Sequence, residues 1–230
     1  MATIFVFTNK CPETIYPGVL TSPGKPAFPT SGFALPPGPD AAFPNIPAGW
    51  SGRIWARYHC ATDAATGSFG CASGDCGTGR VDCYGNGGGQ APSTLAEFTL
   101  NGHDGKDFYD ISNVDGFNLP IQIVQILPYG GASCATVTCA ADINGECPPE
   151  LVARAADGTK VGCKSGCGAF NTDELCCRGE LYGTPDRCRP SGYSQFFKQR
   201  CPQAYSYAYD DGSSTFTCPS GGNYQIIFCP

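Results

Sequence analysis

Cysteine is the residue type that could do the most chemistry in this sequence. The 230 residues include 16 cysteines but only two histidines, His59 and His103. A zinc site would use such residues in repeated Cys-x2-Cys pairs, and the sequence has no such pair. An even number of cysteines is instead typical of secreted chains, because oxidising compartments allow disulfide bonds to persist. The sequence therefore predicts a secreted protein held by up to eight disulfides.

Other catalytic patterns are weak. Two histidines and scattered serines give no basis for a Ser-His-Asp triad, and fully paired cysteines leave no thiol nucleophile. The glycine-rich run at 85–90 is not followed by Lys and Ser or Thr, so it does not match a phosphate-binding loop. His103 lies in the polar stretch 101–105 and is expected to be exposed. We predict no metal and no cofactor.

The charge balance excludes several classes of partner. Fourteen Lys and Arg against 20 Asp and Glu give a net charge of −6. No basic cluster is present to follow a phosphate backbone, so nucleic acid is not an expected partner. No run of 18 apolar residues could span a membrane. Met1 and Ala2 lead directly into an apolar strand pattern, without the basic segment of a signal peptide, so we expect a mature secreted chain.

The pattern of residues is that of a mainly β protein. With 31 Gly and 20 Pro, the chain is rich in turns. Between residues 12 and 50 the prolines are so dense that only edge strands and turns are expected. Short segments rich in β-branched and aromatic residues predict strands at 3–8, 53–58, 94–100, 107–113, 121–127, 215–218 and 223–229. Closely spaced strands of this kind favour an antiparallel sandwich or barrel.

Residues 134–188 have a different character, because they are rich in cysteine and poor in strand patterns. We expect this stretch to be held by disulfides more than by an apolar core. Short helices are predicted at Pro149–Arg154 and Thr172–Cys177. A further helix is predicted at Tyr193–Arg200, where apolar and charged residues alternate with helical spacing.

A motif at residues 67–83 gives a more specific indication of the protein family. The run from Gly67 to Cys83, with Gly74-Asp75-Cys76 at its centre, resembles the signature of thaumatin-like proteins, the pathogenesis-related family 5 of plants. Ser73 stands where that signature has Thr. Segments at 50–57, 94–98, 110–118, 194–202 and 223–230 also look like segments of this family, so the resemblance covers the whole chain.

The resemblance implies a thaumatin fold, a flattened antiparallel β-sandwich with eight disulfides. The sandwich core would comprise residues 1–133 and 191–230, with a small hairpin region near 60–83. Residues 134–190 would form a disulfide-rich lobe with short helices. The family pairing implies Cys11–Cys229, Cys60–Cys71, Cys76–Cys83, Cys134–Cys218, Cys139–Cys201, Cys147–Cys163, Cys167–Cys176 and Cys177–Cys188.

The resemblance also implies an acidic cleft formed by one arginine and four acids. By motif these are Arg53, Glu97, Asp110, Asp115 and Asp211. Hydrolysis of a glycosidic bond needs one carboxylic acid to protonate the leaving oxygen and a second carboxylate as nucleophile or base. Glu97 is the candidate acid, and Asp115 is the candidate nucleophile or base.

Aromatic residues near these positions are expected to stack on sugar rings. They are Phe98, Phe108, Tyr109 and Phe117. Crowded carboxylates raise one another's pKa, and a nearby arginine opposes this. Such a cleft could hydrolyse a glycan or only bind it.

The function implied by the resemblance is antifungal plant defence through binding of β-1,3-glucan, or of another cell-wall polysaccharide, in the cleft. Two alternatives remain open: a weak endo-β-1,3-glucanase that uses the same cleft, and a protein-binding role such as inhibition of a protease or an amylase. Sweet members of the family are strongly basic, so the sequence pI of about 4.8 argues against a sweet taste. Allergenicity is a further property of acidic members, and we expect a monomer.

Overall fold

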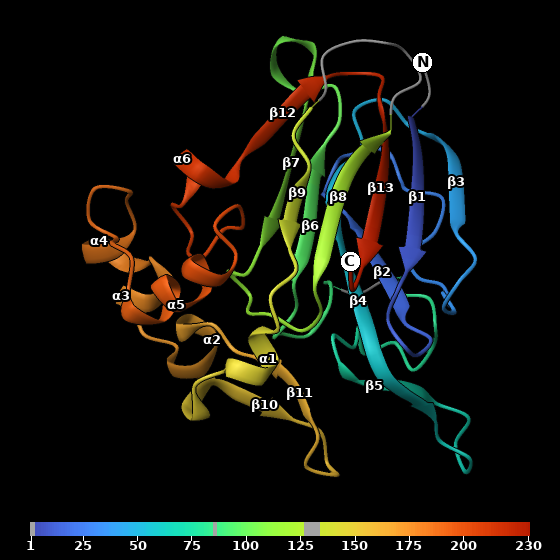
Figure 1. Ribbon diagram of the computed structural model, residues 1–230, viewed down its shortest axis with the longest axis horizontal. Coiled ribbons are helices and arrows are strands. Elements are labelled where there is room, and N and C mark those ends of the chain that lie inside the picture. The colour runs from blue at the N-terminus through green and yellow to red at the C-terminus, as the bar shows by residue number, and fades with distance from the viewer. Residues whose placement is uncertain (1–2, 85–86, 127–133) are drawn as a thin grey trace.

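Two β-sheets form the larger part of the molecule (Figure 1). The computed structural model describes residues 3–84, 87–126 and 134–230. The first sheet has five strands in the order β3-β1-β13-β8-β9. Their bounds are β1 Thr3–Asn9, β3 Ala41–Ile46, β8 Ile121–Ile126, β9 Val137–Cys139 and β13 Asn223–Phe228.

The second sheet has six strands and carries the candidate site. Its order is β12-β7-β6-β4-β2, and β5 pairs with the far end of β4. The bounds are β2 Tyr16–Thr21, β4 Ser51–Thr62, β5 Phe69–Ser73, β6 Leu95–Thr99, β7 Lys106–Ser112 and β12 Phe216–Pro219. Pairing in the two sheets is antiparallel except that β1 runs parallel to β13. The predicted strands are confirmed, with residue 127 outside the described residues.

An aromatic core fills the space between the sheets. Side chains in β1 alternate strictly between buried and half-buried, so Phe5 and Phe7 point into the core. The Phe5 ring contacts Phe98 of the facing sheet at a centroid distance of 4.9 Å. Tyr224 of β13 contacts Tyr109 of β7 at 5.5 Å. These contacts make the two sheets a single sandwich with one continuous core.

Proline-containing strands lie at the edges of the sheets, as the sequence predicts. Pro17 is in β2, the edge strand of the six-stranded sheet, and Pro44 is in β3, the edge strand of the other sheet. An edge strand tolerates proline because its missing N–H can face away from the neighbouring strand.

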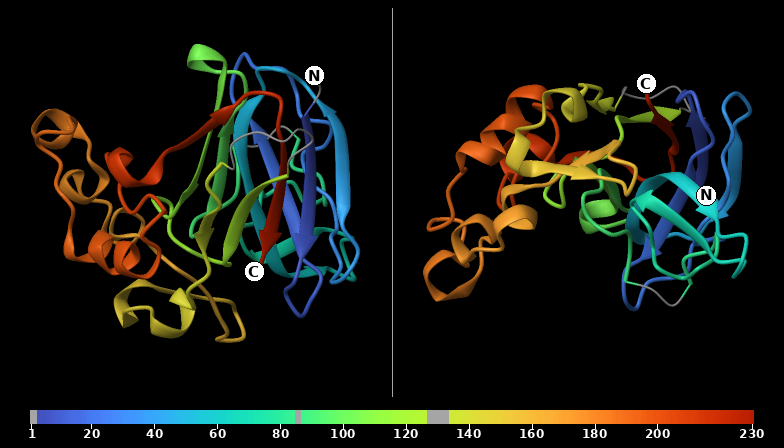
Figure 2. Two further views of the ribbon diagram at one scale, coloured as in Figure 1. Left: turned by 45° about the horizontal axis from the view of Figure 1, so that its top comes forward. Right: turned by 90° about the horizontal axis from the view of Figure 1, so that it is seen from below.

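A helical lobe, residues 143–200, lies beside the sandwich (Figure 2). It contains a two-stranded sheet of β10 (Val152–Arg154) and β11 (Lys160–Cys163), and the 3-10 helix η2 (Pro149–Leu151). The remaining described helices are η1 His103–Gly105, α1 Ile143–Glu146, α2 Gly166–Phe170, α3 Asp173–Cys176, α4 Gly179–Tyr182, α5 Gly192–Arg200 and α6 Asp211–Ser214. Across the described part of the chain, no helix has the length and apolar character needed to cross a membrane.

The helix predictions are confirmed in part. Helix α3 begins after Thr172, whose hydroxyl accepts from the Leu175 N–H, and α5 begins after Ser191 in the same way. The expected helix at Pro149–Arg154 is wrong after Leu151, because residues 152–154 pair with β11. The sandwich also extends past the expected boundary at residue 133, because β9 pairs with β8 and buries Val137.

All sixteen cysteines form disulfides, in the eight pairs that the family resemblance implies. Three of these bonds lie within the helical lobe, and Cys139–Cys201 connects the end of helix α5 to strand β9. The Cys11–Cys229 bond joins the ends of β1 and β13.

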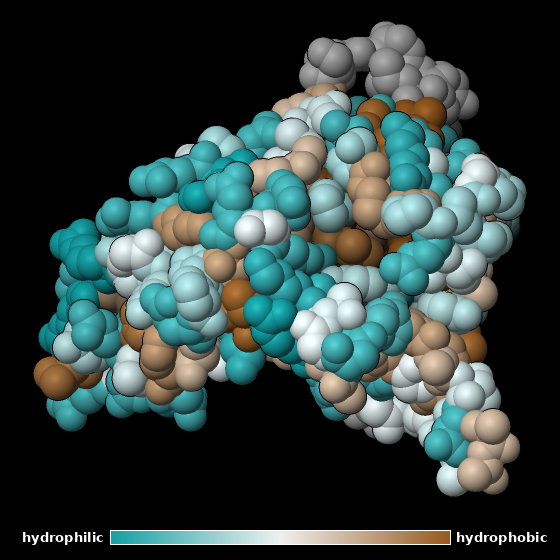
Figure 3. Space-filling view, turned by 60° about the horizontal axis from the view of Figure 1, so that its bottom comes forward, coloured by the Kyte–Doolittle hydropathy of each residue, from teal (hydrophilic) through white to brown (hydrophobic). Residues whose placement is uncertain are grey.

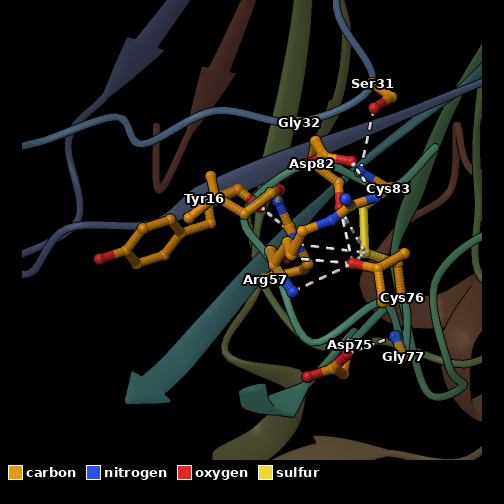
Figure 4. The surroundings of a disulfide bond; sticks show 12 residues. Tyr16, Ser31, Gly32, Arg57, Asp75, Cys76, Gly77, Asp82 and Cys83 are labelled. Atoms are coloured by element: carbon orange, nitrogen blue, oxygen red, sulfur yellow. Dashed lines mark hydrogen bonds and ion pairs between the residues drawn. A yellow bond between two sulfur atoms is a disulfide. The ribbon is translucent and has the colours of Figure 1, made fainter. Parts of the chain in front are cut away.

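Arg57 of β4 connects the Cys76–Cys83 loop to the sandwich (Figure 4). Its side chain is fully buried and donates to the carbonyl oxygens of Tyr16 and Val81 and to Cys76 Sγ. Burial lowers the pKa of Arg57 to about 10, although nearby carboxylates oppose the change. Carbonyl acceptors replace the water that the buried guanidinium loses, so this arginine is structural.

Candidate functional site

Three of the predicted site residues form a row across neighbouring strands of the six-stranded sheet. Arg53 of β4 is paired with Glu97 of β6, and Glu97 is paired with Asp110 of β7. Directly paired residues of adjacent strands project from the same face of a sheet. The row therefore lies on the outer face of the sheet, away from the aromatic core. Two acids placed directly opposite each other repel, which is unfavourable for folding. Their presence here therefore indicates a functional role.

Asp115 is presented by a tight turn that follows β7. The Gly116 N–H donates to the Asn113 carbonyl oxygen at 2.9 Å, and Gly116 has a φ of +89°. A Cβ atom at Gly116 would lie 2.6 Å from the Cys163 carbonyl oxygen, so only glycine fits there. This turn places Asp115 Oδ2 3.7 Å from Arg53 Nη1. Both side chains are about half exposed, so the pair contributes little to stability.

Asp211 approaches the row from the segment 205–214. It is the first residue of α6, and its Oδ1 accepts a hydrogen bond of 2.7 Å from the Tyr205 hydroxyl. The Tyr205 backbone is held to the sheet, because its N–H donates to the Ile111 carbonyl oxygen and its own carbonyl accepts from Asn113. The neighbouring Asp210 points elsewhere, toward Lys198.

The five predicted residues, Arg53, Glu97, Asp110, Asp115 and Asp211, all line one cleft of about 500 Å³. Other lining residues include Ser51, Thr99, Phe108, Ser112 and Tyr205. A cavity of this size is typical of small-molecule and oligosaccharide sites. Figure 3 shows a face of the molecule on which hydrophilic residues predominate and apolar residues form only small, separate areas.

Two half-buried acids of the cleft have raised pKa values. Desolvation by burial, with repulsion from Glu97 and Asp211, raises the pKa of Asp110 to about 8. Asp110 Oδ1 is buried and accepts no hydrogen bond. Burial also raises the pKa of Glu97, an effect that Arg53 opposes and Asp115 reinforces. The cleft can therefore offer a protonated carboxyl group near neutral pH.

Carboxylates are also common ligands of metal ions. Within residues 3–84, 87–126 and 134–230, no group of three or more His, Cys, Asp or Glu side chains could hold a metal ion.

The expectation that four aromatic residues stack on sugar rings is wrong for three of them. Phe98, Tyr109 and Phe117 are 3, 0 and 1% exposed, and their side chains belong to the core. For Phe98 and Tyr109 the reason is the alternation of side chains along a strand. Since Glu97 and Asp110 face the cleft, their neighbours Phe98 and Tyr109 must face the core. Phe108, two residues from Asp110, is half-buried and lines the cleft.

Tyr205 is a cleft residue, bound to Asp211, that sequence reasoning missed. Its hydroxyl lies between Asp211 and Thr215, and burial raises its pKa, as do the neighbouring acids Asp110 and Asp211. The residue lies in an irregular segment, Ala204–Asp210, where no strand or helix pattern indicates which side chains point inward.

The chain belongs to the thaumatin family, whose family model matches residues 9–230. It is 52% identical to thaumatin-like protein 1 of Pyrus pyrifolia, over 98% of this chain and 90% of that protein. It is 49% identical to pathogenesis-related protein 5 of Arabidopsis thaliana, over 100% of this chain and 91% of that protein. A glucan endo-1,3-beta-glucosidase of Prunus avium is 48% identical, with the same coverage of 100% and 91%.

Among solved structures, a thaumatin-like xylanase inhibitor shares the fold. It matches with a TM-score of 0.51 and 21% identity, covering 98% of this chain and 99% of the inhibitor. At this identity the likeness concerns the fold alone.

Proposed function

We propose that this protein is a secreted plant defence protein that binds β-1,3-glucan of fungal cell walls in the acidic cleft. The observation that carries the proposal is the gathering of Arg53, Glu97, Asp110, Asp115 and Asp211 around one open cavity. Relatives named pathogenesis-related protein 5 and glucan endo-1,3-beta-glucosidase support the defence role and the ligand. Eight disulfides are compatible with the secretory pathway and with extracellular conditions. All five residues come from one chain, so a monomer suffices.

The balance of hydrogen-bonding groups in the cleft suits a polyhydroxylated ligand. The acids supply acceptors for glycan hydroxyls, and Arg53 can donate to glycan oxygens in return. Phe108 supplies an apolar surface at the cleft wall, against which the C–H face of a sugar ring can pack.

Hydrolysis of the bound glucan is a second candidate function, favoured by the raised pKa values of Asp110 and Glu97. A protonated carboxyl group can act as the general acid on the leaving oxygen, while Asp115 acts as nucleophile or base. Asp110 is the acid with the higher pKa, so it competes with Glu97 for the role of proton donor.

The test is a comparison of binding and turnover on laminarin, a soluble β-1,3-glucan. Glu97→Gln and Asp110→Asn keep the shape of each side chain but cannot deliver a proton. If one of these acids is the general acid, its amide variant should lose about 10²–10⁴-fold in release of reducing ends. Binding should change only about fivefold, the effect of one hydrogen bond.

The outcomes separate the two functions. A wild-type protein that binds laminarin and releases no reducing ends is a binding protein without hydrolytic activity. Turnover that survives both substitutions would refute catalysis by these acids. Absence of laminarin binding by the wild type would refute the glucan proposal itself. Asp157→Asn, at an exposed loop of the helical lobe outside the cleft, is the control for general effects of charge.

A further inference from the structure

A charged pair lies behind the cleft, outside its lining. Lys198 Nζ of helix α5 is 3.0 Å from Asp210 Oδ2, and the two side chains are 26% and 13% exposed. Among the ion pairs of the described residues, no other has both side chains less than a third exposed. Neither residue lines the cleft. A pair this enclosed needs further hydrogen bonds to compensate for the loss of water.

The pair makes these further hydrogen bonds with residues of the segment 204–214. Lys198 Nζ donates to the Ala204 carbonyl oxygen at 3.0 Å and to Ser214 Oγ at 2.9 Å. Asp210 Oδ2 also accepts from the N–H and the hydroxyl of Ser206, at 2.9 and 2.8 Å. The three donors of the ammonium group are thus fully used, and they connect both ends of this segment to helix α5.

The same segment forms one wall of the cleft, since it carries Tyr205 and Asp211. Tyr205 is fixed to the sheet through its own backbone. Asp211 has no such backbone link to the sheet among the described contacts, and it directly follows Asp210. The Tyr205 hydroxyl holds the Asp211 side chain, and the contacts of the adjacent Asp210 hold its backbone, so both set the position of Asp211 relative to Asp110.

We propose that Lys198 and Asp210 are positioning residues of the cleft, whose ion pair fixes helix α6 so that Asp211 faces a bound glycan. The inference rests on the glucan-binding function proposed above for the same site. It gives the helical lobe a role in binding, because helix α5 of the lobe sets the position of the cleft wall.

The first test replaces Lys198 with residues of similar length. Lys198→Met removes the charge and the donors, and we expect laminarin to bind about five- to tenfold more weakly, as for one or two lost hydrogen bonds. Lys198→Arg keeps a charged donor and should restore binding to within about threefold of the wild type. Arg200→Met is the matched control on the same helix, because Arg200 pairs with Glu146 and lies outside the cleft lining.

A double variant separates positioning from stability. In Lys198→Met alone, Asp210 stays buried without its partner, so thermal stability also falls. Lys198→Met with Asp210→Asn removes both charges and should recover much of the unfolding temperature. Laminarin binding should stay weak in the double variant, because helix α6 is still untethered. Wild-type affinity in the double variant would overturn the proposal.

A second readout needs no glucan. Repulsion from Asp211 is one of the causes that raise the pKa of Asp110 to about 8. If Asp211 moves away in Lys198→Met, the side-chain carboxyl signal of Asp110 should titrate at lower pH in ¹³C NMR spectra of the ligand-free protein. An unchanged Asp110 titration would overturn the positioning role. Failure of the wild type to bind laminarin would refute only the proposed function, since this titration reports on the cleft geometry independently.

Discussion

At the scale of single residues, Asp110 is the most perturbed acid of the cleft. It is half-buried beside Glu97 and Asp211, and its pKa of about 8 lies far above that of an aspartate in an unfolded chain. The folded state therefore binds this proton more tightly than the unfolded state does. By linkage, the contribution of Asp110 to stability is complete below about pH 4 and is lost as the pH rises toward 8.

This linkage predicts the effect of Asp110→Asn on stability. The amide cannot ionise, so the variant should not show the loss of folding stability that the wild type shows between about pH 4 and pH 8. At pH 4 the two proteins should unfold at similar temperatures. At pH 8 the variant should be more stable, by an amount on the order of a few kcal/mol. Thermal unfolding followed by circular dichroism across this range checks the prediction.

Asp63 is a control, because its contribution to stability has the opposite dependence on pH. This exposed carboxylate accepts hydrogen bonds from the N–H groups of Ala65 and Thr66, which lower its pKa. Its contribution to stability is present above the unfolded pKa and is lost at acid pH. Asp63→Asn should therefore lower the unfolding temperature more at pH 8 than at acid pH. If Asp110→Asn behaved like Asp63→Asn, the assignment of Asp110 as a protonated group would be wrong.

At the scale of elements, alternate side chains of strands β6 and β7 face the cleft and the core. Glu97, Phe108 and Asp110 face the cleft, while Phe98 and Tyr109 face the core. The period of two residues along a strand makes this division unavoidable. Substitutions at neighbouring positions should therefore have different effects.

Phe98→Ala and Phe108→Ala test this division directly. Removal of the buried Phe98 ring should destabilise the fold by about 3–5 kcal/mol through the cavity that it leaves. Removal of the half-buried Phe108 ring should cost less stability but weaken laminarin binding, because the cleft loses an apolar wall. Chemical denaturation and affinity measurements on both variants provide the comparison. Equal effects on binding from the two variants would contradict the assignment of faces.

Secondary-structure elements could be predicted from the sequence better than the face of a sheet on which a side chain lies, or the contacts between distant residues. Alternation and proline placement predicted strands such as β1 and the edge position of β2, because these signals are local. The cleft residues extend from Arg53 to Asp211, and local patterns do not encode contacts over such separations. Motif resemblance supplied those five residues. Where local reasoning stood alone, it placed Phe98 in the cleft and omitted Tyr205.

At the scale of the whole molecule, the helical lobe depends on its disulfides. Helices α1 to α4 have only four or five residues each, too few to be stable by themselves. Three disulfides, Cys147–Cys163, Cys167–Cys176 and Cys177–Cys188, hold this lobe together internally. The sandwich, in contrast, has an extensive aromatic core.

Stepwise reduction should therefore unfold the lobe before the sandwich. Ellman titration of the denatured native protein should first give no free thiol, and two or more thiols per chain would contradict the observed pairing. After partial reduction, proteolysis followed by mass spectrometry should find early cleavage within residues 143–190. Laminarin binding should fall at the same stage, because helix α5 and the lobe support the cleft wall. Cleavage that begins in the sandwich strands would contradict this order.

The parallel pairing of β1 with β13 has a consequence for synthesis of the chain. Phe5 pairs with Tyr224, so β1 can pair with β13 only after more than two hundred further residues have left the ribosome. Until then the five-stranded sheet lacks the strand between β1 and β8, and Phe5 lacks its contact with Tyr224. The unpaired edge of β1 is a site at which the nascent chain can aggregate during translation. Completion of the sandwich, and closure of Cys11–Cys229, can occur only after translation has passed β13.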